Sequence, residues 1–174
     1  DADPFQTPWL AEYLTGISTR AGAPLLANAA TTAGGNIYNT SFLWDPATTG
    51  ATPRREQVQT HAKRHPVPFG EYVPLRPYLP FLEPLVVSVG DFTAGTSNEP
   101  LALGPMRLGL LICYESIFPD LARQRVSREA NLLVNLTNDA WYGRSSAPHQ
   151  SMAMAVFRAV ENKRSLVRAA NTGI

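Results

Sequence analysis

The strongest constraint on the fold of this sequence lies between residues 106 and 139, where two apolar runs flank a stretch with helical character. The runs "MRLGLLIC" (106–113) and "NLLVNLTND" (131–139) are continuous rather than alternating, which is typical of strands buried on both faces. The segment "SIFPDLARQRVSREA" (116–130) between them predicts a helix with Ser116 as its N-cap. Two such strands joined by a helix predict a β-α-β unit.

The same alternation continues toward the end of the sequence. "APHQSMAMAVFRAVENKR" (147–164) predicts a second helix, with Met152, Val156 and Ala159 on one apolar face. "SLVRAANTG" (165–173) follows with the character of a further strand. Helices and strands that alternate in this way predict an α/β fold in which the faces of the sheet are covered.

The first half of the chain is less regular. Apolar residues at near-helical spacing predict a helix over residues 8–21, and residues 24–30 and 36–45 read as strands that could pair as a hairpin. Residues 56–63 have weaker strand character. Six prolines between residues 66 and 84 exclude a long helix or a central strand there.

Composition excludes several classes of protein. The 174 residues suit one domain, and Lys plus Arg total 15 against 14 for Asp plus Glu, without a basic block, so a nucleic-acid footprint is not indicated. No apolar run approaches the roughly 18 to 20 residues that span a bilayer. We therefore expect the chain as given to be soluble, and its abrupt ends suggest a piece of a longer polypeptide.

Cys113 is the only cysteine, so an intramolecular disulfide is impossible. It falls where a buried strand ends and a helix begins, a place where a side chain can point into a crevice and where helix amides favour a thiolate. From the residues alone, packing and nucleophilic roles stay equally open. Glu115 is open in the same way, as a carboxylate at a helix start or as a polar member of a site.

Two other predicted strands also end in polar loops. Lys63 ends the weak strand and precedes a proline-framed turn that carries Glu71, although a lysine at a strand end is more often simply solvated. Asn138, Trp141 and Tyr142 lie in the loop where the strand at 131–139 ends, and an ordinary turn with surface aromatics is the alternative. Three strands that end in polar loops indicate one shared crevice.

Four motifs also resemble a known family, the bacterial apolipoprotein N-acyltransferases, in their nitrilase-like domain within the carbon-nitrogen hydrolase superfamily. The motifs are "KRHPVPFGEYVPLRPYL", "LLICYESIFPDLAR", "NLTNDAWYG" with "APHQ", and "RAVENKRSLVRAANTGI". The resemblance runs from about residue 36 to the end, and "DADPF" resembles the segment that follows a "WPEN" motif in actinobacterial members. It implies an α-β-β-α sandwich, incomplete at both ends, formed by residues 1–174 as part of a catalytic domain without its membrane-spanning part.

The resemblance also assigns roles to residues. The superfamily uses a Glu-Lys-Cys triad in which the cysteine attacks an acyl carbon, and Cys113 matches the nucleophile and Lys63 the lysine that stabilises the oxyanion. Glu71 and Glu115 match further glutamates important in the acyltransferases, and Tyr114 matches a tyrosine beside the nucleophile.

The loop that holds Asn138, Trp141 and Tyr142 is expected to contact substrate and to shape the acyl pocket. The proton-shuttling glutamate belongs to "WPEN", which the 174 residues do not contain, so we expect this chain alone to be inactive. No cofactor or metal is implied, and His61, His65 and His149 lack ligand-like spacing.

The activity implied is transfer of an acyl chain from a phospholipid, through a thioester, to the N-terminal amine of a lipoprotein at the extracytoplasmic face of the bacterial membrane. A soluble nitrilase-type amidase and a non-catalytic acyl-binding domain are the alternatives. The long apolar loop "VPFGEYVPLRPYLPFLEPLVV" favours the acyltransferase because it suits contact with lipid.

Overall fold

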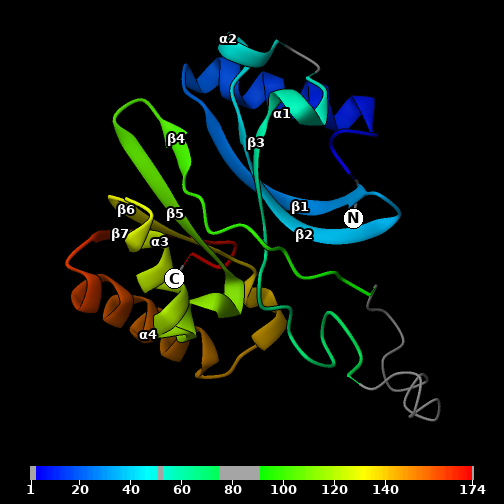
Figure 1. The fold of residues 1–174 in the computed structure, drawn as a ribbon. Helices are drawn as coiled ribbons and strands as arrows, with labels where there is room; N and C mark the ends of the chain where they lie inside the picture. The colour runs from blue at the N-terminus through cyan, green and yellow to red at the C-terminus, as the bar shows by residue number, and fades with distance from the viewer. Residues whose placement is uncertain (1–2, 51–52, 75–90, 174) are drawn as a thin grey trace.

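The computed structural model describes residues 3–50, 53–74 and 91–173. Its strands form two sheets, with strand orders β1-β2-β3 and β4-β5-β6-β7 (Figure 1). In chain order the elements are α1 (Pro8–Ala21), β1 (Leu25–Ala33), β2 (Asn36–Trp44), α2 (Pro46–Thr49), η1 (Arg55–Gln57), β3 (Gln59–Ala62), β4 (Leu101–Leu103), β5 (Met106–Ile112), η4 (Cys113–Ile117), α3 (Pro119–Ser127), β6 (Leu132–Thr137), η5 (Asp139–Tyr142), α4 (Ala147–Asn162) and β7 (Ser165–Ala170), where η denotes a 3-10 helix.

The first sheet is antiparallel. β1 and β2 form the predicted hairpin, and their turn consists of Gly34 and Gly35, with φ angles of 57° and 79° that glycine adopts without strain. β3 pairs with β2 and is shorter than predicted, since residues 55–57 form a 3-10 turn before it. The hairpin prediction is confirmed, and β3 ends directly before Lys63.

The second sheet contains the predicted β-α-β unit. β5 and β6, which α3 connects along the chain, pair in parallel, and β7 adds a third parallel strand. β4 pairs antiparallel with β5 and was not predicted, because three residues are too few to show a hydrophobic period. The parallel pairing brings the carboxyl ends of β5, β6 and β7 to one edge, where the candidate site lies.

The two sheets pack against each other, and helices cover their outer faces (Figure 1). Alternate residues of β2 serve both layers. Phe42 and Trp44 pack with α1, whereas Leu43 packs with Leu110 and Val134 of the second sheet. On the far face of that sheet, a third cluster joins α3 to β5 and β6 through Leu111, Leu121, Ala122 and Leu133. The order of layers is α-β-β-α, which confirms the predicted fold.

The predicted apolar face of α4 is not its buried face. Met152 and Val156 are 39 % and 55 % exposed, and only Ala159 is partly covered. The buried residues of α4 are small or polar: Pro148, Ser151, Ala155 and Arg158. Arg158 donates hydrogen bonds to two backbone carbonyls of η4, so polar contacts help to determine which side of α4 faces inward.

Two further expectations are corrected or lie outside the described part. Ser116 does not cap α3, because the chain first forms η4; its hydroxyl donates to the carbonyl of Cys113, and Pro119 occupies the first turn of the helix. Residues 66–74 form an irregular turn, closed by a hydrogen bond from Phe69 N to Tyr72 O. Residues 75–84 of the proline-rich stretch lie outside the described residues.

Candidate active site

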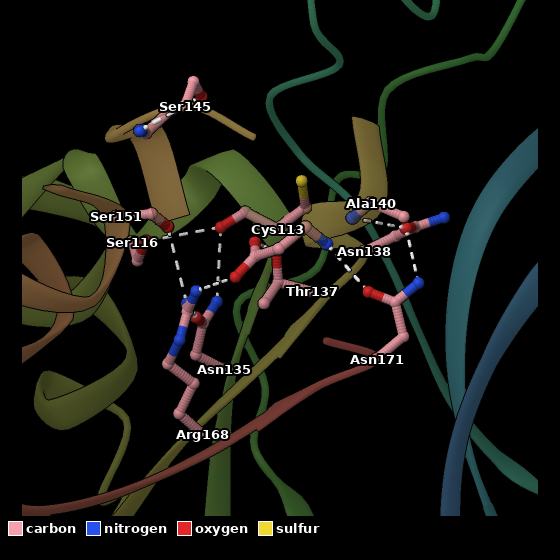
Figure 2. Close-up of polar contacts among 12 residues, drawn as sticks. Cys113, Ser116, Asn135, Thr137, Asn138, Ala140, Ser145, Ser151, Arg168 and Asn171 are labelled. Atoms are coloured by element: carbon pink, nitrogen blue, oxygen red, sulfur yellow. Dashed lines mark hydrogen bonds and ion pairs between the residues drawn. The ribbon is translucent and has the colours of Figure 1, made fainter. Parts of the chain in front are cut away.

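Cys113 lies where β5 ends and η4 begins. Its backbone φ is +53°, a left-handed conformation that is uncommon for a residue other than glycine and that clusters at functional sites. The residue is half-buried, and its side chain points away from the polar residues beneath its backbone (Figure 2). The prediction that Cys113 joins a buried strand to a helical turn is confirmed, although the turn is a five-residue 3-10 helix.

Glu115 connects the turn that carries Cys113 to the segment after β3. Its side chain is fully buried, and Oε2 accepts a hydrogen bond from Ile112 N at 2.8 Å. Oε1 accepts from Arg64 N at 2.6 Å and from His65 N at 3.1 Å. Both carboxylate oxygens therefore bind backbone amides, and they hold the residues after Lys63 against the Cys113 turn.

Lys63 extends the first sheet by one residue. Its amide donates to Asn39 O at 2.8 Å, and its carbonyl accepts from Gly95 N at 2.7 Å. Its side chain is only 1 % exposed, and Nζ forms an ion pair of 2.7 Å with Glu71 Oε2. The structure thus buries an ammonium group, where the sequence alone favoured a solvated lysine.

Glu71 is held by three donors. Oε2 accepts from Lys63 Nζ and from Val67 N, each at 2.7 Å, and Oε1 accepts from Asn39 Nδ2 at 2.6 Å. Asn39 lies on β2, opposite the end of β3, and sequence reasoning missed it. A polar residue in the alternating strand at 36–45 carried no separate signal, because half of such a strand is expected to be polar.

Tyr142 lies beside Cys113. The pKa of its hydroxyl is raised above the usual value, first by burial and then by the neighbouring Cys113 and Asp139 side chains, while the Arg168 guanidinium opposes the rise. The neighbouring Trp141 is 79 % exposed. Asn138 is also exposed and begins η5, where its Oδ1 accepts from Ala140 N at 3.2 Å. The structure therefore brings Tyr142 to Cys113 but leaves Trp141 and Asn138 at the surface.

Tyr114 packs against a neighbouring aromatic ring. Its ring meets Phe118 edge-on at 5.0 Å between centroids, and His65 stacks on the other side of the same cluster at 4.7 Å from Phe118. These rings surround the start of α3. Tyr114 therefore belongs to an aromatic group beside the nucleophile turn.

A buried polar group lies beneath Cys113, and sequence reasoning missed two of its members, Asn135 and Arg168 (Figure 2). Asn135 and Asp139 are fully buried, and the Arg168 side chain is 8 % exposed. Asn135 and Arg168 interrupt the apolar runs of β6 and β7, and a polar residue within a buried strand is the signal that could have identified them. Among the described residues, no group of three or more His, Cys, Asp or Glu side chains is placed to hold a metal ion.

The arrangement offers a nucleophile, a buried cation and a phenolic hydroxyl at the ends of strands from both sheets. A thiol held in a half-buried turn can form an acyl intermediate, and a buried ammonium stabilises negative charge more strongly than a solvated one. Within the described residues, no helix is long and apolar enough to cross a membrane.

Comparison with known proteins agrees with this geometry. A profile described as carbon-nitrogen hydrolase matches residues 8–174, nearly the whole chain. The chain belongs to the carbon-nitrogen hydrolase family. Its α-β-β-α layers and its cysteine at a strand end are therefore features of a carbon-nitrogen hydrolase domain.

Curated relatives of this carbon-nitrogen hydrolase domain carry a more specific name. This chain is 58 % identical over 123 residues to the apolipoprotein N-acyltransferase of Geobacter metallireducens, a match that covers 71 % of this chain and 24 % of the relative. It is 41 % identical over 177 residues to the apolipoprotein N-acyltransferase of Methylococcus capsulatus, covering 99 % of this chain and 32 % of the relative. The chain thus spans no more than about a third of these relatives' length.

Solved structures share the fold at low identity. A cysteine-to-serine mutant of the Nesterenkonia AN1 amidase, from the nitrilase superfamily, is 22 % identical with a TM-score of 0.62, and the match covers 98 % of this chain and 56 % of that one. A carbon-nitrogen hydrolase from Helicobacter pylori G27 has 16 % identity and a TM-score of 0.62, covering 92 % of this chain and 50 % of that one. These likenesses show the fold that this carbon-nitrogen hydrolase domain adopts.

Proposed function

We propose that this chain is part of an N-acyltransferase that moves an acyl chain from a phospholipid, through a thioester on Cys113, to the N-terminal amine of a lipoprotein. The names of the curated relatives support this substrate class. The observation that carries the proposal is the buried Lys63–Glu71 ion pair on the segment that Glu115 ties to the Cys113 turn. A thiol can form the acyl intermediate and a buried ammonium can stabilise the oxyanion, so the two groups together suit acyl transfer.

In the first half-reaction, the Cys113 thiolate attacks the carbonyl carbon of a phospholipid ester. A C–S bond forms while the carbonyl electrons move to oxygen, and the Lys63 ammonium stabilises that oxyanion. The oxyanion then collapses, the ester C–O bond breaks, and the lysophospholipid leaves. Its oxygen takes the proton lost by the thiol, and the family resemblance assigns that transfer to the glutamate of a "WPEN" motif, which these 174 residues do not contain.

In the second half-reaction, the neutral amine of the lipoprotein attacks the thioester carbonyl carbon. A C–N bond forms, the C–S bond breaks, and the Cys113 thiolate is regenerated. The amine loses one proton to the same carrier. The amine and the first leaving group use one site in turn, as expected for a covalent intermediate.

The two other glutamates act by orienting groups. Glu71 accepts three hydrogen bonds and keeps the Lys63 ammonium in one place, and Asn39 holds the far oxygen of Glu71. Glu115 binds only backbone amides, so its part is to keep the Lys63 segment in register with Cys113.

The aromatic residues near Cys113 serve the acyl chain. Tyr142 contacts the nucleophile, Tyr114 lies directly after it, and Trp141 presents an exposed indole that suits contact with lipid. Asn138 holds the start of the 3-10 turn that carries Trp141 and Tyr142. We place the reaction at the extracytoplasmic surface of the bacterial membrane, where phospholipid and lipoprotein meet; no organic cofactor or metal has a part in it.

The test is to incubate the full-length protein with a phospholipid of defined acyl chain and to measure its intact mass. We expect an added acyl group on Cys113, which disappears when a peptide with a lipid-modified N-terminal cysteine is added. Cys113→Ser removes the adduct and changes the free energy of unfolding by no more than about 1 kcal/mol. An acyl adduct that persists in Cys113→Ser contradicts the proposal.

An amidase is the second candidate, because the structurally similar Nesterenkonia enzyme is named an amidase. In that case water would hydrolyse the thioester on Cys113 and release the acyl group as a free acid. The same experiment separates the two functions, since an amidase releases free acid from a small amide and gives no acylated peptide.

A further inference from the structure

The backbone of the nucleophile is held from below by one side chain of the neighbouring strand. Asn135 Nδ2 donates to Leu111 O at 2.8 Å. The same nitrogen donates to Cys113 O at 3.2 Å (Figure 2). The two carbonyls lie on either side of Ile112, at the point where β5 turns into η4. Asn135 is fully buried, so no water competes for these hydrogen bonds.

Arg168 of β7 determines which way the Asn135 amide faces. Its Nη1 donates to Asn135 Oδ1 at 2.7 Å, so the NH₂ group of that amide must face the carbonyls of Leu111 and Cys113. The same guanidinium forms an ion pair with the fully buried Asp139 through Nη2. One cation therefore contacts both the support of Cys113 and the first residue of η5.

Asp139 extends this support to the segment that carries Tyr142. Its second oxygen accepts from Thr137 Oγ1 at 2.9 Å, and its amide donates to Asn171 Oδ1 at 2.9 Å. Asn171 Nδ2 in turn donates to Asn138 Oδ1 at 2.7 Å. The start of η5 is thus set relative to the strand that bears Arg168.

We propose that Asn135 and Arg168 are positioning residues for acyl transfer: Asn135 holds Cys113 in its left-handed conformation, and Arg168 keeps η5 and Tyr142 in register with it. This inference rests on the proposed function. The two residues touch neither substrate nor the reacting atoms. They act through the backbone of Cys113.

The physical reason is the strain at Cys113. A left-handed conformation is strained for a non-glycine residue and persists only where neighbouring contacts maintain it. Without the two Asn135 hydrogen bonds, the side-chain support of the Cys113 carbonyl is reduced to the longer hydrogen bond from Ser116 Oγ at 3.3 Å, and the Cys113 peptide can relax toward an ordinary turn. A displacement of about 1 Å at the nucleophile is enough to cost on the order of 100-fold in rate.

The test compares Asn135→Asp with Asn131→Asp in the full-length protein. In Asn135→Asp, the introduced carboxylate would still accept from Arg168 but would have no amide to donate to the two carbonyls. Asn131 precedes the same strand at its opposite end, where its side chain also bonds backbone groups, at Arg107 and Pro105. Arg168→Lys and Arg164→Lys form the second matched pair, because Arg164 binds the carbonyl of Ala130 far from Cys113.

Two rates are measured for each variant, both normalised to titrated Cys113 in folded protein: acylation at saturating phospholipid, and alkylation by iodoacetamide. We expect Asn135→Asp to slow acylation about 10- to 100-fold, while the phospholipid concentration that gives half of the maximal rate stays within about threefold of that of the unaltered protein. We also expect it to slow alkylation about fivefold or more. Arg168→Lys should give smaller losses in the same direction. Both controls should stay within about twofold of the unaltered protein.

The outcomes separate the two hypotheses. If the unaltered protein forms no acyl adduct, the proposed function fails, and the alkylation rates still test the positioning role. If Asn135→Asp retains both rates within about twofold, or loses them only in proportion to its unfolded fraction, Asn135 is structural and the inference is overturned.

Discussion

A buried histidine gives the sharpest prediction about stability. His61 lies on β3, two residues before Lys63, and is 1 % exposed. Its Nε2 is 3.0 Å from Arg125 Nη2, and because a guanidinium can only donate, Nε2 accepts and the neutral ring carries its proton on Nδ1. Arg125 also donates to Leu110 O at 3.1 Å. The pair therefore joins β3 of one sheet to α3 and β5 of the other.

Protonation of His61 opposes folding. Burial first, and then the charges of Arg125 and Arg64, lower the pKa of His61 from 6.5 to about 3. Between these two values the unfolded chain binds a proton at this residue and the folded chain does not, so acid favours unfolding. The contribution of neutral His61 is complete above pH 6.5 and is lost as the pH falls; at pH 5 the loss is about 2 kcal/mol.

The assay is urea unfolding at pH 8 and pH 5, with His61→Gln compared with the unaltered protein. Glutamine stays neutral and can still accept from Arg125, so we expect its pH-dependent loss of unfolding free energy to be smaller by about 2 kcal/mol. His149→Gln is the matched control, because His149 is exposed on α4 and its loss should leave the pH dependence unchanged.

The reasoning is refuted if His61→Gln loses as much stability between pH 8 and pH 5 as the unaltered protein does. It is also refuted if the His61 ring titrates near pH 6.5 in the folded state, measured by NMR. Either result would mean that the ring is hydrated or that its contact with Arg125 does not require the neutral form.

Three other substitutions test the site and its support. Glu115→Gln places an amide against Ile112 N and should lower the free energy of urea unfolding by about 1–3 kcal/mol, whereas Asp120→Asn, at a side chain 79 % exposed, should change it by less than about 0.5 kcal/mol. Gly95→Ala would bring a Cβ to 2.3 Å from the backbone oxygen of Ala62, beside Lys63, and should lower the melting temperature. As its control, Gly16→Ala in α1 meets no close contact and should stabilise the protein by about 0.5–1 kcal/mol. Equal effects of the two substitutions would contradict the close approach of the backbone at Gly95. Trp141→Ala should weaken binding to phospholipid vesicles in a flotation assay without a change in stability beyond about 0.5 kcal/mol, and unchanged binding would exclude a role for the indole in lipid contact.

Much of the fold could be predicted because its signals are local. Strands buried on both faces consist of continuous apolar runs, so β5 and β6 were evident, and a Gly-Gly pair between two strand-like segments is typical of a hairpin. The place of Cys113 followed from the end of an apolar run. Local signals also failed where they were short or ambiguous, as in three-residue β4, and where an apolar stripe on α4 suggested a face that the structure leaves exposed.

The candidate site could be predicted only in part. Cys113, Lys63, Glu71 and Glu115 were named from their positions and from the family resemblance, and the structure connects them through one ion pair and a set of backbone contacts. Their particular partners could not be deduced. Asn39 is 32 residues from Glu71 in sequence, and no periodicity links such a pair.

The sequence by itself determined the order of the longer strands and helices and the position of the only thiol, because each depends on residues close together in the chain. Only the tertiary structure decided that Lys63 is buried against Glu71, that Cys113 adopts a left-handed backbone, and that Asn135 and Arg168 support it from two other strands. These are properties of buried polar groups, whose partners come from distant segments and whose desolvation must be compensated wherever the fold brings them together.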